Sequence, residues 1–369
     1  MKVLHIFPTC KIGGAPLCVL RLIKNSRDKN IHVICYNADN ELFGEFEKYS
    51  TIHNIDVSRF SISSLTSVFL LFKKLKPDVI HCHGKGGALY TFFLSIFKLI
   101  YSFKIFYTLH GFHLKYKGVK LKLFLLFERV FSKIYDQSIS VSASEQVNFI
   151  KYTKVNSDKN TVIHNGIELD DCVRSNYDDI LKEVEHYSYN AVTLSRISPE
   201  KDLIRMIRAF DSANLSNVAL HIIGGSFRDT NYQLNVEKII NELNISNVFL
   251  WGDIPKASSI LQYFDFYIST SLFEGLPTSI IEAQMSKLLV VATDCIGNID
   301  LVEDGISGIL VKVGDTDSIS EGIRYAFSKL NTIHHRRIVD NASHKSELYS
   351  ITNHVNNINN LYENKNKDY

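Results

Sequence analysis

Two carboxylates, Glu274 and Glu282, stand eight positions apart in FEGLPTSIIEAQ, residues 273–284. Glu274 lies in a turn favoured by Gly275 and Pro277, and Glu282 falls inside the helix predicted by the apolar pattern that follows. Because carboxylates accept hydrogen bonds from hydroxyls, this spacing can place two hydroxyl-rich parts of one ligand on either side of a helix start. The alternative is that Glu274 is a surface acid and Glu282 belongs to a capping or inter-helix ion pair.

The start of that helix could bind an anion. Pro277 can begin a helix because the N–H that it lacks would have no intrahelical partner there. The N–H groups of Thr278 and Ser279 then point outward and can donate hydrogen bonds to a phosphate. A sugar at Glu274, a diphosphate at the helix start and a ribose at Glu282 together describe a nucleotide sugar.

Two cations follow another predicted strand, in VTLSRISPEKDL at residues 192–203. Arg196 lies just past the strand, and Lys201 lies where the next helix is expected to begin. Arg can hold two phosphate oxygens in a fork and Lys adds a point charge, so the pair suits a diphosphate. Taken alone, the stretch is slightly better explained as a solvated loop before a helix that starts at Ser-Pro-Glu.

A paired glycine follows the first predicted strand, in PTCKIGGAPLCVL at residues 8–20. Gly13 and Gly14 let the backbone approach a ligand, and a helix N-terminus after them favours an anion. An ordinary tight turn explains them about as well. The dinucleotide fingerprint G-x-G-x-x-G is absent, which argues against a nicotinamide dehydrogenase. Asp39 and Glu41 could hold a ribose, although surface acids are common at such positions.

Two further stretches imitate metal sites. His81 and His83 in HCHGKGG share one face of a strand, but no third ligand or carboxylate lies nearby in the sequence, so we predict no zinc there. Asp315 and Asp317 in GDTD resemble a metal-binding Asp-x-Asp motif, but they precede a helical pattern and are interpreted as a helix N-cap. We expect neither a metal nor a cofactor.

These residues need a scaffold, and strand patterns alternate with helical ones twice along the chain. The expected strands are KVLHIF, IHVICY, DVIHCH, KIFYTLH, SISVS and TVIHNG in the first half, and NAVTLS, NVALHIIGG, NVFLWGD, FDFYIST, LLVVATD and SGILVKVG in the second. Strands that are apolar on both faces fit parallel sheets covered by helices. The sequence therefore predicts an α/β protein with two Rossmann-like, doubly wound domains that face a central cleft, where ligands bind.

The bulk properties agree with two globular domains. The chain has 369 residues, of which 45% are hydrophobic and 22% charged. The polar, acidic segment 167–189 breaks the alternation and is interpreted as a linker. The N-terminal apolar run stops at Pro8, as expected for a strand rather than a signal peptide, and no apolar run is long enough to span a membrane. We therefore expect a cytoplasmic protein.

The six cysteines show no CxxC spacing and are dispersed through apolar stretches, which is typical of buried, reduced thiols. They are Cys10, Cys18, Cys35, Cys82, Cys172 and Cys295.

Five motifs in this order resemble one family. They are IGGA at residues 12–15, TLHG at 108–111, VIHNGIE at 162–168, RISPEK at 196–201 and the Glu274-x7-Glu282 pair with Gly275 and Pro277. From residue 3 to about 345, the chain resembles the retaining glycosyltransferases of the large GT4 family, whose fold is GT-B. The resemblance implies an N-terminal acceptor-binding domain at 1–170 and a nucleotide-sugar-binding domain at 171–345. A C-terminal helix that crosses back to the first domain, with a polar tail, would occupy 346–369.

The resemblance also implies roles for the candidate residues. Arg196 and Lys201 would hold the donor's diphosphate, with a backbone N–H of Gly14 approaching from the other domain. Glu274 would contact the donor sugar, Glu282 the ribose, and the backbone between Trp251 and Pro255 the base. His110 matches the family histidine beside the reacting sugar. The expected catalytic residues are His110, Glu274, Arg196 and Lys201, and the expected donor-binding residues are Gly13, Gly14, Arg196, Lys201, Gly252, Ile254, Glu274, Gly275, Leu276, Pro277, Thr278 and Glu282.

His113 lies outside the family pattern and is interpreted as an acceptor-side or structural residue.

Charge divides unevenly between the two halves. Residues 1–170 hold 23 Lys and Arg against 13 Asp and Glu, whereas 171–369 hold 18 against 26. Between residues 98 and 133, one acid, Glu128, stands among the basic residues Lys98, Lys104, Lys115, Lys117, Lys120, Lys122, Arg129 and Lys133. Leucines and aromatics interleave with them, which suits binding to an anionic membrane leaflet. The alternative is a buried apolar face with a solvated lysine rim. No nucleic-acid motif accompanies the charge.

We therefore expect a retaining, metal-independent glycosyltransferase on the cytoplasmic face of the inner membrane. It would move a hexose or N-acetylhexosamine from a nucleotide sugar, with UDP favoured by family frequency, to a lipid-linked oligosaccharide in surface polysaccharide or O-antigen assembly. Retention without a carboxylate nucleophile fits front-face chemistry, in which Glu274 orients the donor. The alternatives are a nucleotide-sugar epimerase of the same fold and a non-catalytic partner subunit of a transferase complex.

Overall fold

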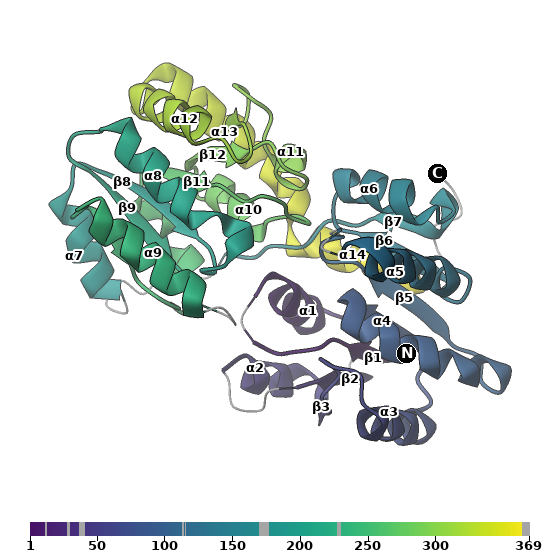
Figure 1. The fold of residues 1–369 in the computed structure, drawn as a ribbon. Helices are drawn as coiled ribbons and strands as arrows, with labels where there is room; N and C mark the ends of the chain where they lie inside the picture. The colour runs from purple at the N-terminus through teal and green to yellow at the C-terminus, as the bar shows by residue number, and fades with distance from the viewer. Residues whose placement is uncertain are drawn as a thin grey trace. The chain divides into compact units, whose positions relative to one another are not determined.

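The chain forms two compact units in a computed structural model (Figure 1). The structure describes residues 1–11, 13–27, 30–36, 41–112, 114, 116–169, 177–226 and 230–363. Unit 1 comprises Met1–Ile167 and Tyr349–Tyr369, and unit 2 comprises Glu168–Leu348. The divisions expected from the sequence fall after residues 170 and 345.

The strands described in unit 1 form one parallel sheet in the order β3-β2-β1-β4-β5-β6-β7. Their bounds are β1 Lys2–Ile6, β2 Asn30–Cys35, β3 Thr51–Asn54, β4 Val79–His83, β5 Lys104–Thr108, β6 Gln137–Ser140 and β7 Asn160–Val162. The register sets His5 of β1 beside His81 of β4. Neighbouring parallel strands hold such residues on the same face of the sheet.

Helices connect these strands, as parallel pairing requires. They are α1 Gly14–Lys24, α2 Glu41–Tyr49, α3 Ile62–Leu75, α4 Gly84–Leu94, α5 Gly118–Phe131 and α6 Ala143–Thr153, with short 3-10 turns at Ser95–Leu99 and Ser157–Lys159. Ser61 and Ser142 cap α3 and α6 by accepting a hydrogen bond from the backbone three residues on.

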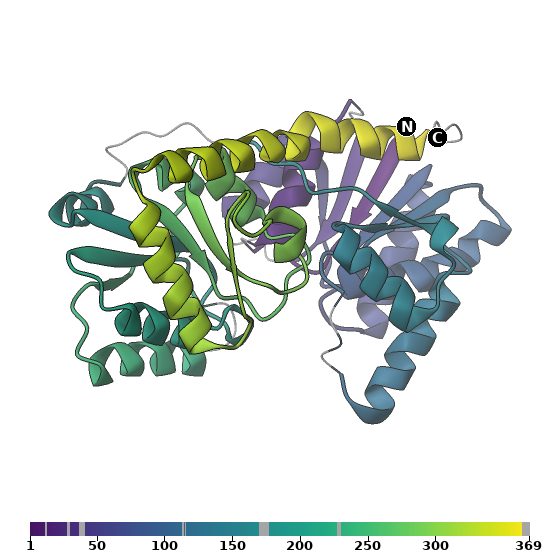
Figure 2. The ribbon, with the colours of Figure 1, turned by 90° about the horizontal axis from the view of Figure 1, so that it is seen from above.

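The C-terminal helix α14 (Ile351–Tyr362) completes unit 1. Its apolar residues Val355, Ile358 and Tyr362 share a core with residues of β1, β4 and β5. The Tyr362 hydroxyl lies 2.6 Å from Nδ1 of His81, which joins the last helix to the fourth strand. Figure 2 shows the yellow helix running alongside the sheet of unit 1.

Unit 2 has a second parallel sheet in the order β10-β9-β8-β11-β12-β13. Its strands are β8 Tyr189–Leu194, β9 Val218–Ile223, β10 Val248–Leu250, β11 Phe266–Ser269, β12 Leu289–Thr293 and β13 Ile309–Val311. Its helices are α7 Asp178–His186, α8 Leu203–Ala213, α9 Thr230–Glu242, α10 Thr278–Met285, α11 Asn298–Leu301, α12 Thr316–Lys329 and α13 Ile333–Ser346, with 3-10 turns at Pro199–Lys201, Ala257–Tyr263 and Glu347–Tyr349. Asp315 caps α12 through the N–H of Ser318, so the N-cap interpretation is confirmed.

Two Rossmann-like parallel sheets confirm the predicted α/β class. The strand β3 was missed because its four residues, TIHN, are half-exposed at the sheet edge and carry no apolar run. The expected linker contains α7, whose Ile180, Leu181 and Val184 are buried. The helix was not predicted because acidic residues surround these apolar positions, although the spacing of the apolar positions is helical.

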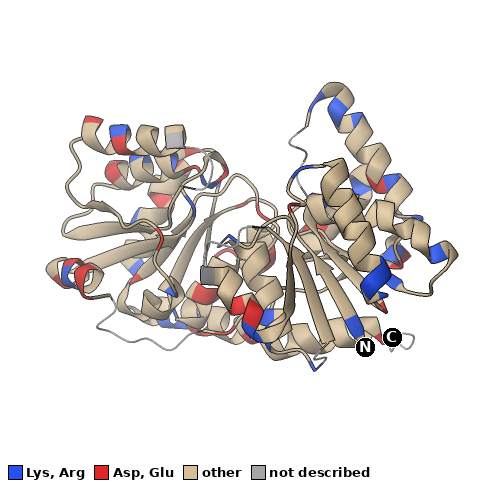
Figure 3. Ribbon diagram, turned by 90° about the horizontal axis from the view of Figure 1, so that it is seen from below, with Lys and Arg blue, Asp and Glu red and all other residues tan. Residues whose placement is uncertain are grey.

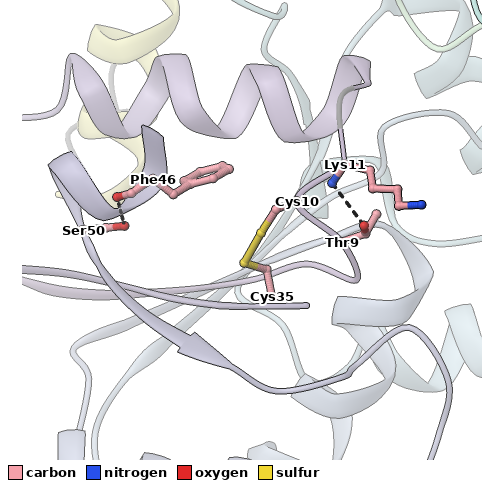
Figure 4. Close-up of a disulfide and its surroundings, with 6 residues drawn as sticks. All are labelled: Thr9, Cys10, Lys11, Cys35, Phe46 and Ser50. Carbon is pink, nitrogen blue, oxygen red and sulfur yellow. Dashed lines mark hydrogen bonds between the residues drawn. A yellow bond between two sulfur atoms is a disulfide. The ribbon is translucent and has the colours of Figure 1, made fainter. Parts of the chain in front are cut away.

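A disulfide joins Cys10 and Cys35 (Figure 4), which corrects the expectation that all six cysteines are reduced. Cys10 follows β1 and Cys35 ends the adjacent strand β2, so their Cα atoms lie 6.1 Å apart, within the range for a disulfide. Sequence spacing gave no sign of the pair because strand pairing brings the two residues together. Cys18, Cys82 and Cys295 are buried thiols, and Cys172 lies outside the described residues.

Among the helices described, none combines the length and apolar character that a membrane-spanning segment requires.

Candidate functional site

Each sheet has a point where the strand order reverses direction. In unit 1 this point lies between β1 and β4, and in unit 2 between β8 and β11. Connections leave the two strands toward opposite sides there, so ligands of open α/β sheets bind beside the carboxyl ends of these strands. The candidate residues of unit 2 follow β8 and β11, and the histidines of unit 1 lie on and after β1, β4 and β5.

In unit 2 the structure brings Lys201 and Glu274 together. Nζ of Lys201 lies 2.5 Å from Oε1 of Glu274, and the hydroxyl of Ser271 donates to the same oxygen at 2.6 Å. The two charged side chains are only 16% and 15% exposed. A charge-assisted bond in a partly desolvated place is stronger than an exposed surface pair, so this contact fixes both side chains.

The backbone around this pair is also fixed. The Thr270 hydroxyl donates to the carbonyl of Lys201 at 2.9 Å, and the N–H of Glu274 donates to the carbonyl of Ile296 at 3.0 Å. Gly297 has φ 88°, and a Cβ there would lie 2.8 Å from the carbonyl oxygen of Gly275. Only glycine fits this close approach, so the turn after β12 holds the Glu274 loop in place.

Arg196 lies just beyond β8 but takes a different arrangement from Lys201. Its guanidinium is 3.6 Å from Oε1 of Glu200, and its side chain is 40% exposed. The backbone of Glu200 is tied to the other loop, because its carbonyl accepts from the N–H of Leu272 at 2.9 Å. Arg196 is therefore a more accessible cation than Lys201 at the same end of the sheet.

The helix α10 starts one residue later than predicted. Pro277 is the N-cap, with ψ 104°, and the first helical residue is Thr278. The extended ψ of Pro277 prevents it from joining the helix, which corrects its assignment as the first helical residue. No side chain caps this end, so the first N–H groups of α10 remain suited to an anion. Leu276 and Glu282 are buried, at 5% and 7% exposure.

The stretch expected to line a base follows β10. Gly252 has φ 68°, and its carbonyl accepts from the N–H of Gly224 at 2.7 Å, which joins the loops after β9 and β10. Ile254 is half-buried. Trp251 donates its indole N–H to Nδ1 of His221 at 3.1 Å, and the planes of the two rings are parallel within 2°.

The paired glycine lies at the start of α1 in unit 1. Gly13 is the N-cap in extended backbone, and Gly14 is the first helical residue. A Cβ on Gly14 would meet nothing within 4 Å, so open space lies beside it. Asp39 and His113 lie outside the described residues, as does the side chain of Glu41.

His110 lies in the loop after β5 with φ 52°, a conformation that non-glycine residues rarely adopt. The buried carboxylate of Glu145 holds this loop. It accepts from the N–H groups of Gly111 at 2.6 Å and Phe112 at 2.7 Å through Oε1, and from Val141 at 2.7 Å through Oε2. Glu145 is 1% exposed. It is therefore the residue that fixes the backbone carrying His110.

Four further histidines surround His110 within unit 1. Nε2 of His110 lies 3.0 Å from Nδ1 of His83, whose Nε2 lies 3.0 Å from Nδ1 of His5. His81 bonds to the hydroxyls of Tyr362 and Thr108, and His354 bonds through Nδ1 to the carbonyl of His164. A small cavity is lined by His81, His83, His110, His354, Thr108 and neighbouring apolar side chains.

Burial keeps these imidazoles neutral at ordinary pH. It lowers the pKa of His5 and of His110 to about 3 and that of His354 to about 4, and it lowers the pKa of His81 and His83 well below the ordinary value. Desolvation by burial is the largest cause in every case, because it disfavours the charged form of the ring.

The structure corrects the expectation that no third ligand lies near His81 and His83. His5 is a third histidine close enough to His81 and His83 to join them around an ion, since their ligand atoms lie within 4.8 Å of one another. The sequence did not reveal it because strand pairing, rather than local spacing, brings β1 beside β4. The nitrogens of His81 and His83 already hydrogen-bond to other side chains, so the three rings do not form an open ligand set.

Sequence reasoning also missed Glu145 and Ser271. The signal for Glu145 was SASE at residues 142–145, which matches a capping box. Its backbone N–H donates to the Ser142 hydroxyl at 3.2 Å, and its carboxylate holds the His110 loop. Ser271 had no distinctive signal, because a serine before a loop is common.

Comparisons with known proteins agree with this architecture. A model described as Glycosyltransferase Family 4 matches residues 12–171, and one described as Glycosyl transferases group 1 matches residues 182–345. The chain is 27% identical over 270 residues to UDP-Gal:alpha-D-GlcNAc-diphosphoundecaprenol alpha-1,3-galactosyltransferase of Escherichia coli, covering 70% of this chain and 68% of that protein. It is 26% identical over 339 residues to the capsular polysaccharide biosynthesis glycosyltransferase CapM of Staphylococcus aureus, covering 87% and 86%.

The fold is shared with solved structures. The crystal structure of Anabaena Alr3699/HepE in complex with UDP and glucose has a TM-score of 0.85 at 20% identity, and the match covers 99% of this chain and 100% of that one. The two family models together span both units, and the parallel sheets match the GT-B arrangement. The chain therefore belongs to the GT4 family of glycosyltransferases and has the GT-B fold.

Proposed function

We propose that this glycosyltransferase moves a hexose or N-acetylhexosamine from a UDP-sugar to a lipid-linked oligosaccharide, with retention at the anomeric carbon and without a metal. The observation that carries the proposal is the Lys201–Glu274 contact at the strand-order reversal of unit 2. It places a phosphate-binding cation and a hydroxyl-binding carboxylate side by side, as a sugar diphosphate requires.

Each residue of unit 2 then has a role in donor binding. Lys201 and the more exposed Arg196 bind the diphosphate, and the uncapped start of α10 adds backbone donors. Glu274 orients the sugar hydroxyls, while the buried Glu282 accepts from the ribose. The loop of Gly252 and Ile254 meets the base.

The reaction follows from these contacts. The bond between the anomeric carbon and the diphosphate oxygen breaks, and a bond forms from that carbon to the acceptor hydroxyl oxygen on the same face. The acceptor proton passes to the departing phosphate, so no separate base is needed. Lys201 and Arg196 stabilise the charge that grows on the diphosphate, which is where electrostatic catalysis acts. Glu274 stays bonded to Lys201 and does not attack the sugar.

The names of similar proteins support the donor and acceptor classes. The Escherichia coli relative is named for transfer from UDP-Gal to a diphosphoundecaprenol-linked sugar, and the HepE structure holds UDP and glucose. The CapM relative is named for capsular polysaccharide biosynthesis. We therefore assign this chain to the assembly of a surface polysaccharide such as an O-antigen.

The surface of α5 supports binding to the cytoplasmic face of the membrane. Its exposed apolar residues recur at helical spacing and form one stripe: Val119 at 71% exposure, Leu123 at 60%, Leu126 at 55% and Val130 at 41%. The exposed Lys120 and Lys122 lie on the same helix, and its basic residues are blue in Figure 3. Apolar side chains beside cations favour an anionic leaflet. Part of the 98–133 segment is nevertheless core, since Phe103, Phe112 and Phe131 are buried.

The test is a donor panel followed by product analysis. One UDP-sugar should raise the melting temperature of the wild type, since ligand at about a hundredfold its Kd adds about 2.7 kcal/mol, and it should fail to stabilise Arg196→Ala or Glu282→Ala. With a diphosphoundecaprenol-linked acceptor, that donor should yield an elongated lipid whose new linkage keeps the donor's anomeric configuration by NMR. A changed sugar nucleotide formed without acceptor would instead show an epimerase and refute the proposal.

A further inference from the structure

Three imidazoles form one hydrogen-bonded chain in unit 1. It runs from His5 on β1 to His83 at the end of β4 and on to His110 in the loop after β5. Both links are 3.0 Å long and join ring nitrogens directly. His5 and His83 are 2% and 3% exposed, so they cannot themselves meet a bulky substrate.

A neutral imidazole carries one N–H and one acceptor nitrogen. The direction of donation in one hydrogen bond of the chain therefore determines the direction in the next. If Nε2 of His110 donates to His83, then His83 must use its own Nε2–H to donate to His5. If Nδ1 of His5 donates instead, then His83 donates from Nδ1 and His110 carries its proton on Nδ1. In both cases all three residues have the same tautomer.

The tautomer decides what His110 offers a ligand. Nε2 of His110 faces His83, so Nδ1 is the nitrogen left for a substrate. In the first arrangement Nδ1 is an acceptor suited to a sugar hydroxyl, and in the second it is a donor suited to a phosphate oxygen.

The surrounding groups favour a chain of neutral rings over a metal site. His81 stacks on His83 with ring centroids 4.1 Å apart, whereas the rings of His5 and His83 lie edge to edge, 18° from parallel, and are joined by their hydrogen bond. Both nitrogens of His83 are used in hydrogen bonds to neighbouring rings, whereas a tetrahedral zinc ion needs nitrogens that are available to converge on it at about 2.0–2.1 Å. The low pKa values of the rings agree with neutral imidazoles.

We infer that His83 and His5 are positioning residues that set the tautomer and orientation of His110 through this chain, and thereby whether His110 donates to the donor substrate or accepts from it. The inference rests on the proposed function in that a sugar is transferred, and on the expectation from the family resemblance that His110 lies beside the reacting sugar. The chain itself is a property of the free protein and can be measured without any substrate.

The first test is NMR of the free protein labelled with ¹⁵N-histidine, with signals assigned by single substitutions. Long-range proton–nitrogen correlations identify which ring nitrogen carries the proton. We expect His5, His83 and His110 to show the same tautomer at pH 7. Opposite tautomers within the three, a charged ring, or an average of both forms at His110 would overturn the inference.

The second test uses two matched substitutions of His83. In His83→Asn the side-chain amide replaces Nδ1 and keeps the contact to His110, whereas in His83→Gln it replaces Nε2 and keeps only the contact to His5. We expect His83→Gln to lower kcat by roughly 10- to 100-fold, as loss of a histidine's supporting partner does, with KM changed only a few-fold. His83→Asn should lose less activity than His83→Gln, because it breaks the link to His5 but keeps the contact to His110. Equal losses in both variants would indicate a merely structural role and refute the inference.

The two tests separate this inference from the proposed function. A common tautomer in a protein that transfers no sugar would leave the chain intact and refute the function. Normal transfer with mixed tautomers would refute the histidine chain and leave the proposed function intact.

Discussion

The two units have similar parallel sheets but place opposite kinds of chemistry at the points where their strand orders reverse. In unit 2 a lysine and a glutamate form a charged contact at 2.5 Å between two loops. In unit 1 buried histidines with lowered pKa form a chain of neutral rings. One backbone geometry therefore supports a site for an anionic ligand and a site that offers only neutral hydrogen bonds. The fold determines where a site can form, and the residues at the strand ends determine its chemistry.

Formal charge alone would suggest the reverse assignment. Residues 1–170 carry the basic excess and 171–369 the acidic one. The cations of unit 1 lie largely on exposed surfaces such as α5, whereas unit 2 holds Lys201 in a partly buried contact. On the proposed function, a few well-placed charges in unit 2 would bind the diphosphate, and net charge acts at longer range.

The largest effect should come from removing the charged contact of unit 2. Lys201→Ala leaves Glu274 without its ion pair and removes a cation from the departing diphosphate. We expect kcat to fall by roughly 10²- to 10³-fold, as for the loss of one donor to a developing anion. Lys287→Ala is the matched control, because that lysine forms an exposed pair with Asp340 and should change transfer less than twofold. Transfer by Lys201→Ala at the wild-type rate would refute the comparison.

The corresponding test in unit 1 targets the carboxylate that holds the His110 loop. In Glu145→Gln one oxygen becomes NH₂, so the N–H of Val141 loses its acceptor if the amide replaces Oε2, and those of Gly111 and Phe112 lose theirs if it replaces Oε1. We expect unfolding free energy to fall by about 1–3 kcal/mol, measured by urea denaturation, with a loss of transfer from the displaced His110. Glu45→Gln removes an exposed pair with Lys48 and should leave stability unchanged. An unchanged midpoint for Glu145→Gln would show that the loop is held by other contacts.

The sequence alone was more informative about the candidate residues of unit 2 than about those of unit 1. The Arg196–Lys201 and Glu274–Glu282 pairs lie in short segments, so their spacing was informative before any fold was known. His5 and Cys35 could not be linked to His83 and Cys10 in this way, because strand pairing brings them together. Glu145 had a local capping signal, but its contact with the His110 loop depends on the packing of α6. Candidate residues that are close in sequence could be chosen from their spacing, whereas contacts across the sheet could not be predicted.

Acid should distinguish the units by stability. A histidine whose pKa is about 3 when folded and about 6.5 when unfolded takes up a proton only on unfolding between these values. The unfolded state then binds more protons, so stability rises with pH and falls as pH decreases from about 6.5 toward 3. Burial lowers the pKa of all five histidines in the cluster of unit 1, whereas His221, with a pKa of about 4, is the strongest case among the described residues of unit 2.

We therefore expect unit 1 to lose protection first on acidification. Hydrogen exchange with mass spectrometry, resolved by peptide, should show faster exchange in β1 and β4 near pH 4.5 while β8 and β11 remain protected. His5→Phe should reduce this acid sensitivity, since it removes one site of proton uptake. Loss of protection in unit 2 before unit 1 would contradict the neutral-histidine account.

The smallest effect should come from the surface charges of α5. Lys122→Ala should weaken binding to vesicles that contain anionic lipid by about 1 kcal/mol, which is about fivefold in the partition constant. The mutation should leave binding to neutral vesicles unchanged, because the apolar stripe from Val119 to Val130 is intact. Lys238→Ala, on the exposed face of α9 in unit 2, is the matched control and should bind as the wild type does.

If sedimentation shows equal losses for Lys122→Ala and Lys238→Ala, or no loss for either, the basic surface of unit 1 is not the membrane contact. If only Lys122→Ala is impaired, unit 1 combines a neutral site at its sheet with a charged surface for the membrane, while unit 2 uses its charges on the donor.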